Sequence, residues 1–308
     1  MPSLFGGALL ALLLSATLVA AGPQPDPQPL CPQALWPDLA PGETSRDTGE
    51  WLPARPGEDP PVTRLKGVAL PTFTLHRPPH PNGTAVVILP GGGFGRVVTN
   101  KEGTEAAEWL NRLGVTALVL RYRTSDTAPT GDSAPPPWRR PLQDAQRLLK
   151  LTRARATEWQ LDPRRVGLLG FSAGGQVAAR LLCDGDEAAY PPADDIDRQP
   201  HRPDFALLLY PWNLTADGGS ALLDGLTPPA GAPACFLVHT DDDRSSALGS
   251  ALFYVALKSR GVASELHVYG HGGHGYGLRP VAGSDVGDWP SHATTWLRAG
   301  GWTPPTAN

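Results

Sequence analysis

The sequence predicts an α/β fold, with a mostly parallel sheet covered by helices on both faces. Short apolar runs alternate with segments of helical periodicity, and parallel strands need such crossover segments. In addition, 41% of the 308 residues are hydrophobic, which is enough apolar material for one large core. The predicted strands span residues 84–89, 115–121, 165–170, 205–210, 234–239 and 264–269.

The helices are predicted from the 3.6-residue spacing of apolar side chains. Ala106, Ala107, Leu110 and Leu113 fall on one face of a helix that ends at Gly114. Further helices are expected over residues 142–159, 173–183, 247–260 and 289–299. Ligands of open parallel sheets bind at the carboxyl ends of the strands, so the functional site is expected there.

Two N-terminal segments are expected to lie outside the single domain, which is placed at residues 62–304. Residues 4–21 form an apolar run ending in Val19-Ala20-Ala21, which predicts a signal peptide over residues 1–21 and a secreted or periplasmic protein. The segment before this run has no Lys or Arg, so an uncleaved membrane anchor is the alternative. Residues 22–61 are rich in proline and predict an extended arm on the domain surface.

Charge and cysteine content exclude several functions. The net charge of −4 and the lack of a basic stripe argue against nucleic acid or an anionic membrane surface as partners, and favour a neutral substrate. Three cysteines are an odd number for an exported protein, so at least one is expected to be free or paired between chains. Cys183 and Cys235 lie in apolar segments typical of buried side chains, and no catalytic thiol is predicted.

A candidate nucleophile lies between a predicted strand and a predicted helix. Gly170-Phe171-Ser172-Ala173-Gly174 matches G-x-S-x-G, in which glycines permit a tight turn that exposes the serine. A serine hydroxyl needs a positioned base to attack a carbonyl, and the base needs an acidic partner. An ordinary glycine-rich turn with a helix-capping serine is the bland alternative.

Candidates for the acid and the base follow the last two strands, in the order that this turn predicts. Asp241, Asp242 and Asp243 come directly after the strand that ends at His239. His271 and His274 share the glycine-rich loop after the final strand. His274 is preferred as the base because Gly273 and Gly275 flank it and let the backbone turn toward the sheet, with His271 as the fallback. The same histidines lack the glutamate and the helix of a zinc signature, so no metal site is predicted.

Donors for an oxyanion are expected from a second glycine-rich loop. Pro90-Gly91-Gly92-Gly93-Phe94 follows the first predicted strand, and the backbone N–H groups of Gly92 and Gly93 can join that of Ala173. A phosphate-binding loop is excluded because the G-K-[ST] ending is missing.

Together these motifs resemble the bacterial acetylxylan esterase-like branch of the α/β hydrolases, near the hormone-sensitive lipase type. The resemblance runs from about Leu35 to Leu297 and rests on Leu89–Phe94, Lys101–Gly103, Arg121–Arg123, Pro141–Arg147, Gly170–Gly175 and His271–Gly277. It implies an α/β-hydrolase fold and a serine carboxylesterase that deacetylates xylan, related carbohydrate esters or small esters without a metal or an organic cofactor.

The resemblance also implies which aspartate is the acid. In this branch the acid commonly lies four positions after the histidine that ends the strand, which gives Asp243, with Asp242 in reserve. Arg244-Ser245-Ser246 departs from the apolar or proline-containing run that often follows there. Two other functions compete with the esterase. One is a serine peptidase of the prolyl oligopeptidase type, although the chain lacks room for the propeller domain of those enzymes. The other is a binding protein that has the hydrolase fold but no catalytic activity.

Overall fold

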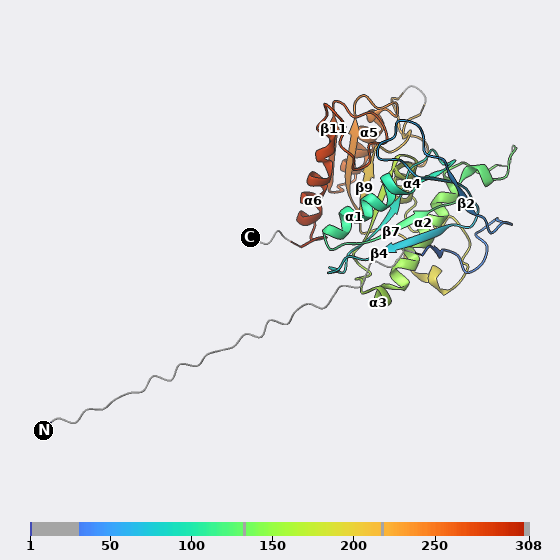
Figure 1. The fold of residues 1–308 in the computed structure, drawn as a ribbon, viewed down its shortest axis with the longest axis horizontal. Coiled ribbons are helices and arrows are strands. Elements are labelled where there is room, and N and C mark those ends of the chain that lie inside the picture. Colours follow the sequence, from blue (N-terminus) through green and yellow to red (C-terminus); the bar gives the residue numbers. More distant parts are fainter. Residues whose placement is uncertain (2–30, 132–133, 217–218, 305–308) are drawn as a thin grey trace. The chain divides into compact units, whose positions relative to one another are not determined.

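The computed structural model describes Met1 and residues 31–304, except residues 132–133 and 217–218 (Figure 1). Apart from Met1, the predicted signal peptide therefore lies outside the described residues. No helix in the described part of the chain is long and apolar enough to span a bilayer.

An eight-stranded sheet forms the centre of residues 31–304, in the order β1-β4-β7-β5-β8-β9-β10-β11. Strands β5 to β11 of this sheet pair in parallel, whereas β4 and β1 are antiparallel at one edge. The bounds are β1 Gln33–Ala34, β4 Thr72–His76, β5 Ala85–Leu89, β7 Thr116–Arg121, β8 Val166–Phe171, β9 Phe205–Leu209, β10 Ala234–Thr240 and β11 Ser264–Tyr269. All six predicted strands are present.

Helices cover both faces of this sheet, as predicted (Figure 1). Alternate residues of β5 show the two faces: Val87 and Leu89 pack in one apolar cluster, and Val86 and Ile88 pack in the other. The first cluster includes side chains of α2, α4 and α5, and the second includes those of α1 and α6. These helices span Arg139–Ala154 (α2), Ser172–Cys183 (α4), Ala247–Ser259 (α5), Glu105–Arg112 (α1) and Trp289–Ala299 (α6).

The helices differ from the predicted ranges in two places. The helix predicted over residues 142–159 is divided at Arg155 into α2 and the short α3 (Ala156–Trp159). A π-helical turn, Asn100–Thr104, precedes α1 and was not predicted. This turn brings Glu102 into contact with Gly91, in the glycine loop that follows β5.

A second, three-stranded antiparallel sheet was also not predicted. It consists of β2 (Thr48–Leu52), β3 (Arg64–Val68) and β6 (Val97–Val98), in the order β2-β3-β6. Since β2 and β1 lie in the segment expected to be an extended arm, the described part of that segment contributes to both sheets.

The start of the described chain is also part of the core. Leu35 and Trp36 are buried, and the indole Nε1 of Trp36 donates a hydrogen bond of 3.0 Å to Asp144 on α2. Asp144 also forms a fully buried ion pair with Arg123, which donates in turn to the carbonyl of Pro41.

Candidate active site

Ser172 lies at the sharp turn between β8 and α4. Its φ of 51° is in the left-handed region, which is strained for any residue with a side chain. The flanking glycines are needed because the backbones approach closely here. A Cβ on Gly170 would lie 2.5 Å from the carbonyl oxygen of Gly174, and one on Gly174 would lie 2.1 Å from that of Leu89. The chain therefore presents the Ser172 hydroxyl on a strained, crowded turn of the kind the motif predicts.

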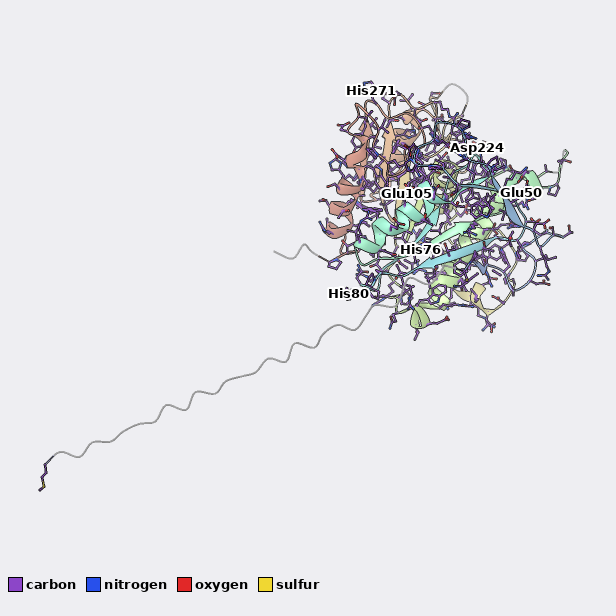
Figure 2. The ribbon with its side chains drawn as sticks, in the orientation of Figure 1. Glu50, His76, His80, Glu105, Asp224 and His271 are labelled. Atoms are coloured by element: carbon purple, nitrogen blue, oxygen red, sulfur yellow. The ribbon has the colours of Figure 1, made fainter. Side chains whose placement is uncertain are left out.

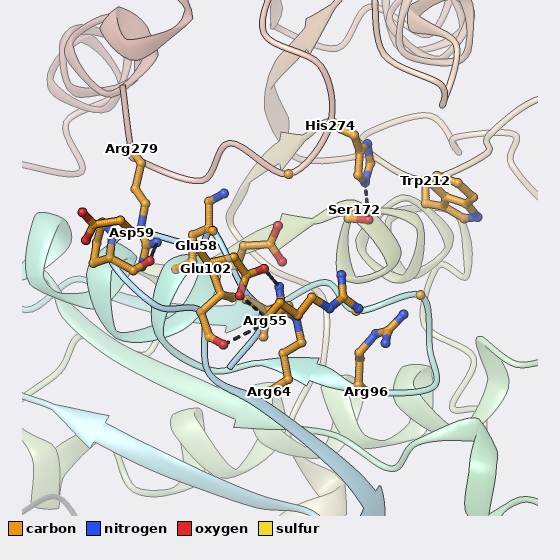
Figure 3. A pocket seen from close by; sticks show the side chains of 18 of the residues that line it. Arg55, Glu58, Asp59, Arg64, Arg96, Glu102, Ser172, Trp212, His274 and Arg279 are labelled. Atoms are coloured by element: carbon orange, nitrogen blue, oxygen red, sulfur yellow. Dashed lines mark hydrogen bonds and ion pairs between the residues drawn. The ribbon is translucent and has the colours of Figure 1, made fainter. Parts of the chain in front are cut away.

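Ser172, His274 and Asp243 form a continuous chain of hydrogen bonds (Figure 3 shows the first link). The Ser172 Oγ lies 2.7 Å from His274 Nε2, and His274 Nδ1 lies 2.7 Å from Asp243 Oδ2. A carboxylate only accepts, so Nδ1 carries the proton and the lone pair of Nε2 faces the serine hydroxyl. This is the tautomer in which His274 can take the proton of Ser172.

Asp243 is held as a carboxylate by the groups around it. Burial alone would raise its pKa, but hydrogen bonds from His239, His274 and the backbone N–H of Ser245 outweigh burial and lower the pKa to about 2. His239 lies 3.2 Å from Asp243 through Nε2 and contacts the carbonyl of Ser245 with the same nitrogen. His239 is fully buried, as expected for a structural histidine at a strand end.

The other predicted candidates lie apart from this chain of hydrogen bonds. Asp241 is exposed, and Asp242 accepts hydrogen bonds from the N–H groups of Gly272 and Gly273, which holds the histidine loop in place. His271 is 80% exposed, lies 3.8 Å from Asp242 and is seen at the edge of the molecule in Figure 2. Of the three aspartates and two histidines, the structure brings only Asp243 and His274 to Ser172.

The glycine loop after β5 lines the cavity in front of Ser172. This cavity has a volume of about 560 Å³ and is bordered by Gly92, Gly93, Ser172 and His274. Gly92 has a φ of 136°, and a Cβ there would lie 2.1 Å from the carbonyl oxygen of Arg96. Ala173 is the second residue of α4, where a backbone N–H has no acceptor within the helix. Two of the predicted oxyanion donors, Gly92 and Gly93, thus lie on the glycine loop, and the third, Ala173, lies in the first turn of α4.

A buried carboxylate that was not predicted connects two loops of the site. Glu102 accepts hydrogen bonds of 2.8 Å from the N–H of Gly91 and from the hydroxyl of Tyr210. The Tyr210 hydroxyl in turn accepts from the N–H of Gly277, in the histidine loop. Burial raises the pKa of Glu102, and the bonds from Tyr210 and Gly91 oppose that rise. Lys101-Glu102-Gly103 is visible as a motif, but no local pattern indicates that its carboxylate holds Gly91.

Trp212, which follows β9, lines the cavity. Its ring is partly buried and meets the His274 imidazole edge-on, with ring centroids 5.3 Å apart. Figure 3 shows Trp212 on the side of Ser172 opposite to Arg279. Trp212 therefore forms part of the cavity wall next to His274.

Comparisons with known proteins identify the fold. A family model described as alpha/beta hydrolase fold matches residues 86–225. The chain is similar to an acetyl ester-xyloside bifunctional hydrolase from Caldicellulosiruptor lactoaceticus, whose crystal structure superposes with a TM-score of 0.66. The two sequences are 29% identical, and the match covers 89% of this chain and 97% of that chain. This chain has the α/β-hydrolase fold.

Two curated relatives extend the comparison. An acetylxylan esterase of Xylanibacter ruminicola is 28% identical over 229 residues, and an endo-1,4-beta-xylanase B of Butyrivibrio fibrisolvens is 29% identical over 212 residues. These matches cover 65% and 62% of this chain but only 42% and 32% of the relatives, so the chain spans less than half of their length. The predicted resemblance to acetylxylan esterases is confirmed.

Proposed function

We propose that this α/β hydrolase is an exported serine carboxylesterase that removes acetyl groups from acetylated xylan or related carbohydrate esters. The observation that carries the proposal is the hydrogen-bonded chain of Ser172, His274 and Asp243, which opens onto a cavity bordered by a glycine loop. The esterase names of the relatives support the ester class, and the peptidase alternative is not favoured. Export rests on the apolar run of residues 4–21, and residues 62–304 would carry the catalysis together with the segment before them.

The geometry supports a two-step acyl transfer. His274 removes the proton of Ser172 as Oγ attacks the ester carbonyl, while Asp243 orients the imidazole and stabilises its positive charge. The N–H groups of Gly92, Gly93 and Ala173 would stabilise the oxyanion. The protonated His274 then donates its proton to the leaving alcohol and an acyl-serine remains. A water molecule, deprotonated by His274, attacks that ester, and collapse of the second intermediate releases acetate and restores Ser172.

The test is acetate release from acetylated xylan by the protein and by its Ser172→Ala variant, with an aryl acetate measured in parallel. Loss of the nucleophile should lower turnover of both esters by several orders of magnitude, about 10⁶-fold where a serine nucleophile is removed. Ser172-dependent cleavage of the aryl ester alone would keep the esterase and discard the xylan substrate. Turnover that survives in Ser172→Ala would remove the serine from the mechanism.

Labelling with a fluorophosphonate separates the esterase from a fold that only binds. The parent protein should be labelled at Ser172, because the reagent captures a serine whose hydroxyl is activated by a neighbouring base. The Asp241→Asn variant is a matched control that should be labelled like the parent, since Asp241 is exposed and lies apart from the hydrogen-bonded chain. A parent protein that remains unlabelled would favour the binding module.

A further inference from the structure

The cavity in front of Ser172 has more positive than negative side chains. Three carboxylates line it, namely Glu58, Asp59 and Glu102. Twice as many cationic side chains line it, namely Arg55, Arg64, Arg96, Lys101, Arg244 and Arg279. The net charge of −4 for the whole chain is therefore no guide to the charge at the site.

Pairing removes part of this positive charge. Arg64 forms an ion pair with Glu58, and Arg279 pairs at 2.6 Å with Glu105, which does not line the cavity. Lys101 is partly buried, which lowers its pKa, and the charge of Glu102 acts on it in the opposite direction. Figure 3 shows Asp59 beside Arg279, at the end of the cavity away from Trp212.

Three arginines remain without a partner. Within the part of the chain that the structure describes, Arg55, Arg96 and Arg244 form no ion pair and no side-chain hydrogen bond. Burial lowers the pKa of Arg96, and the positive charges of Arg55, Arg64 and Arg244 lower it further. Like charges held this close repel each other, and an anion bound between them would relieve that repulsion.

Arg96 and Arg244 come from different loops and line the same cavity as Ser172. Arg96 follows the glycine loop, where its carbonyl closes onto Gly92, and its side chain lines the same cavity as Trp212 (Figure 3). Arg244 follows Asp243 directly and lies over the ring of Trp212, 5.3 Å from the centroid. Since Trp212 contacts His274, an anion held by these arginines would lie next to the ester under attack.

We propose that the natural substrate is an ester with a carboxylate close to the scissile bond, and that Arg96 and Arg244 bind this carboxylate. The proposal rests on the esterase function proposed above and replaces the neutral substrate expected from the net charge. A guanidinium fits a carboxylate because its parallel N–H groups can donate to both oxygens. The carboxylate can belong to the alcohol, for example a uronic acid in an acetylated oligosaccharide, or to an acyl group larger than acetyl, in which case the ester is not an acetate.

Two pairs of synthetic esters test the proposal and distinguish these sources. The acyl-side pair is p-nitrophenyl hydrogen adipate and p-nitrophenyl methyl adipate. The alcohol-side pair is m-acetoxybenzoate and its methyl ester. Within each pair the members differ only in the free or blocked carboxylate, so the ratio of their kcat/KM values, after subtraction of spontaneous hydrolysis, measures recognition of the charge.

The parent protein should favour the free carboxylate in at least one pair by about tenfold or more at low ionic strength, and salt should reduce this preference. Arg96→Gln and Arg244→Gln should each lower the ratio about tenfold, because each substitution removes one charged donor. Arg260→Gln is the matched control. Arg260 is exposed and lies just after the C-terminal end of α5, whereas the N-terminal end of this helix is next to the site.

A kcat/KM ratio near one in both pairs would overturn the proposal, and so would a preference for the carboxylate that both arginine variants retain. In either case, hydrolysis of the esters would still support the esterase function. Calorimetric titration of the Ser172→Ala protein with m-acetoxybenzoate and its methyl ester gives a readout that needs no turnover. Tighter binding of the carboxylate, weakened by Arg244→Gln, would support the anion site even if no ester were hydrolysed. Equal binding of the two ligands would overturn it.

Discussion

Replacing Glu102 by Gln should disconnect the glycine loop from the rest of the site. The carboxylate accepts from two donors, the N–H of Gly91 and the hydroxyl of Tyr210, and both bonds are buried. A glutamine has one acceptor oxygen for these two donors, and its NH₂ group would face the other one. The Glu102→Gln side chain can accept from Gly91 only by turning its NH₂ group toward the Tyr210 oxygen, which leaves the Tyr210 O–H without its acceptor.

The size of the effect follows from that single lost bond. A buried donor without an acceptor costs about 1–3 kcal/mol, and relief from burying a charge offsets part of this, so the free energy of unfolding should fall by about 1–2 kcal/mol. A shift of the loop by about 1 Å would displace the oxyanion donors, for which a rate loss of about 10²-fold is expected. The loss should appear in kcat rather than in KM, because these donors act on the transition state.

Urea unfolding monitored by tryptophan fluorescence gives the stability, and steady-state hydrolysis of p-nitrophenyl acetate gives kcat and KM separately. Glu108→Gln is the control, since Glu108 is an exposed glutamate on the neighbouring helix α1. A purely structural Glu102 would lower stability without changing kcat at temperatures where the variant is folded. That result, or a kcat within twofold of the parent, would refute the positioning role.

Three further predictions concern the proposed triad. Asp243→Asn should lower kcat about 10⁴-fold, because it favours the wrong tautomer of His274. Asp242→Asn should lower kcat less than about tenfold. Steady-state kinetics that rank the two variants in the reverse order would make Asp242 the acid. Because the pKa of Asp243 is depressed to about 2, its carboxylate stabilises the fold fully above about pH 4 and progressively less as pH falls through 2, by about 2 kcal/mol in total. Acid titrations of the free energy of unfolding should show this loss in the parent and not in Asp243→Asn. Ser172→Gly should unfold at a higher temperature than Ser172→Ala, by about 1 kcal/mol of stability, because glycine tolerates a φ of 51°; equal melting temperatures would show that the turn is unstrained.

Most strands that the sequence predicts are buried along nearly their whole length, and the mostly half-buried β11 is the exception. Strand β5 and strand β9 are buried on every residue, so they read as continuous apolar runs between helical segments. Strand β2 is exposed along most of its length, and β1 and β6 have two residues each, which leaves no apolar pattern to detect. Their pairing is decided by tertiary contacts.

Site residues could be predicted to the extent that their chemistry is local. A strand, a glycine turn and a helix around Ser172 form a pattern within a few residues, as does the glycine-flanked His274. Asp241, Asp242 and Asp243 look equivalent in the sequence, and Asp243 is preferred only through the resemblance. The tight turn after β10 separates them, because it buries Asp243 beside His239 and leaves Asp241 exposed.

The cavity's surplus of arginines has no local pattern at all. Arg55, Arg96 and Arg244 are far apart in the chain and are assembled by the loops around the site. The net charge averages them with acidic residues elsewhere, which is why it favoured a neutral substrate. Charge at a site depends on the fold and cannot be obtained by summing over a sequence.

The burial of Trp36 beneath α2 has a practical consequence for shortening the gene. An expression boundary at residue 62 would follow the proline content, but it would delete the indole that donates to Asp144 and the Pro41 carbonyl that accepts from Arg123. Losing a buried tryptophan costs about 3–5 kcal/mol, and the buried ion pair of Arg123 and Asp144 would lose two of its hydrogen-bond partners. A truncated protein that is meant to fold should therefore begin upstream of Gln33 and keep the proline-rich residues that follow.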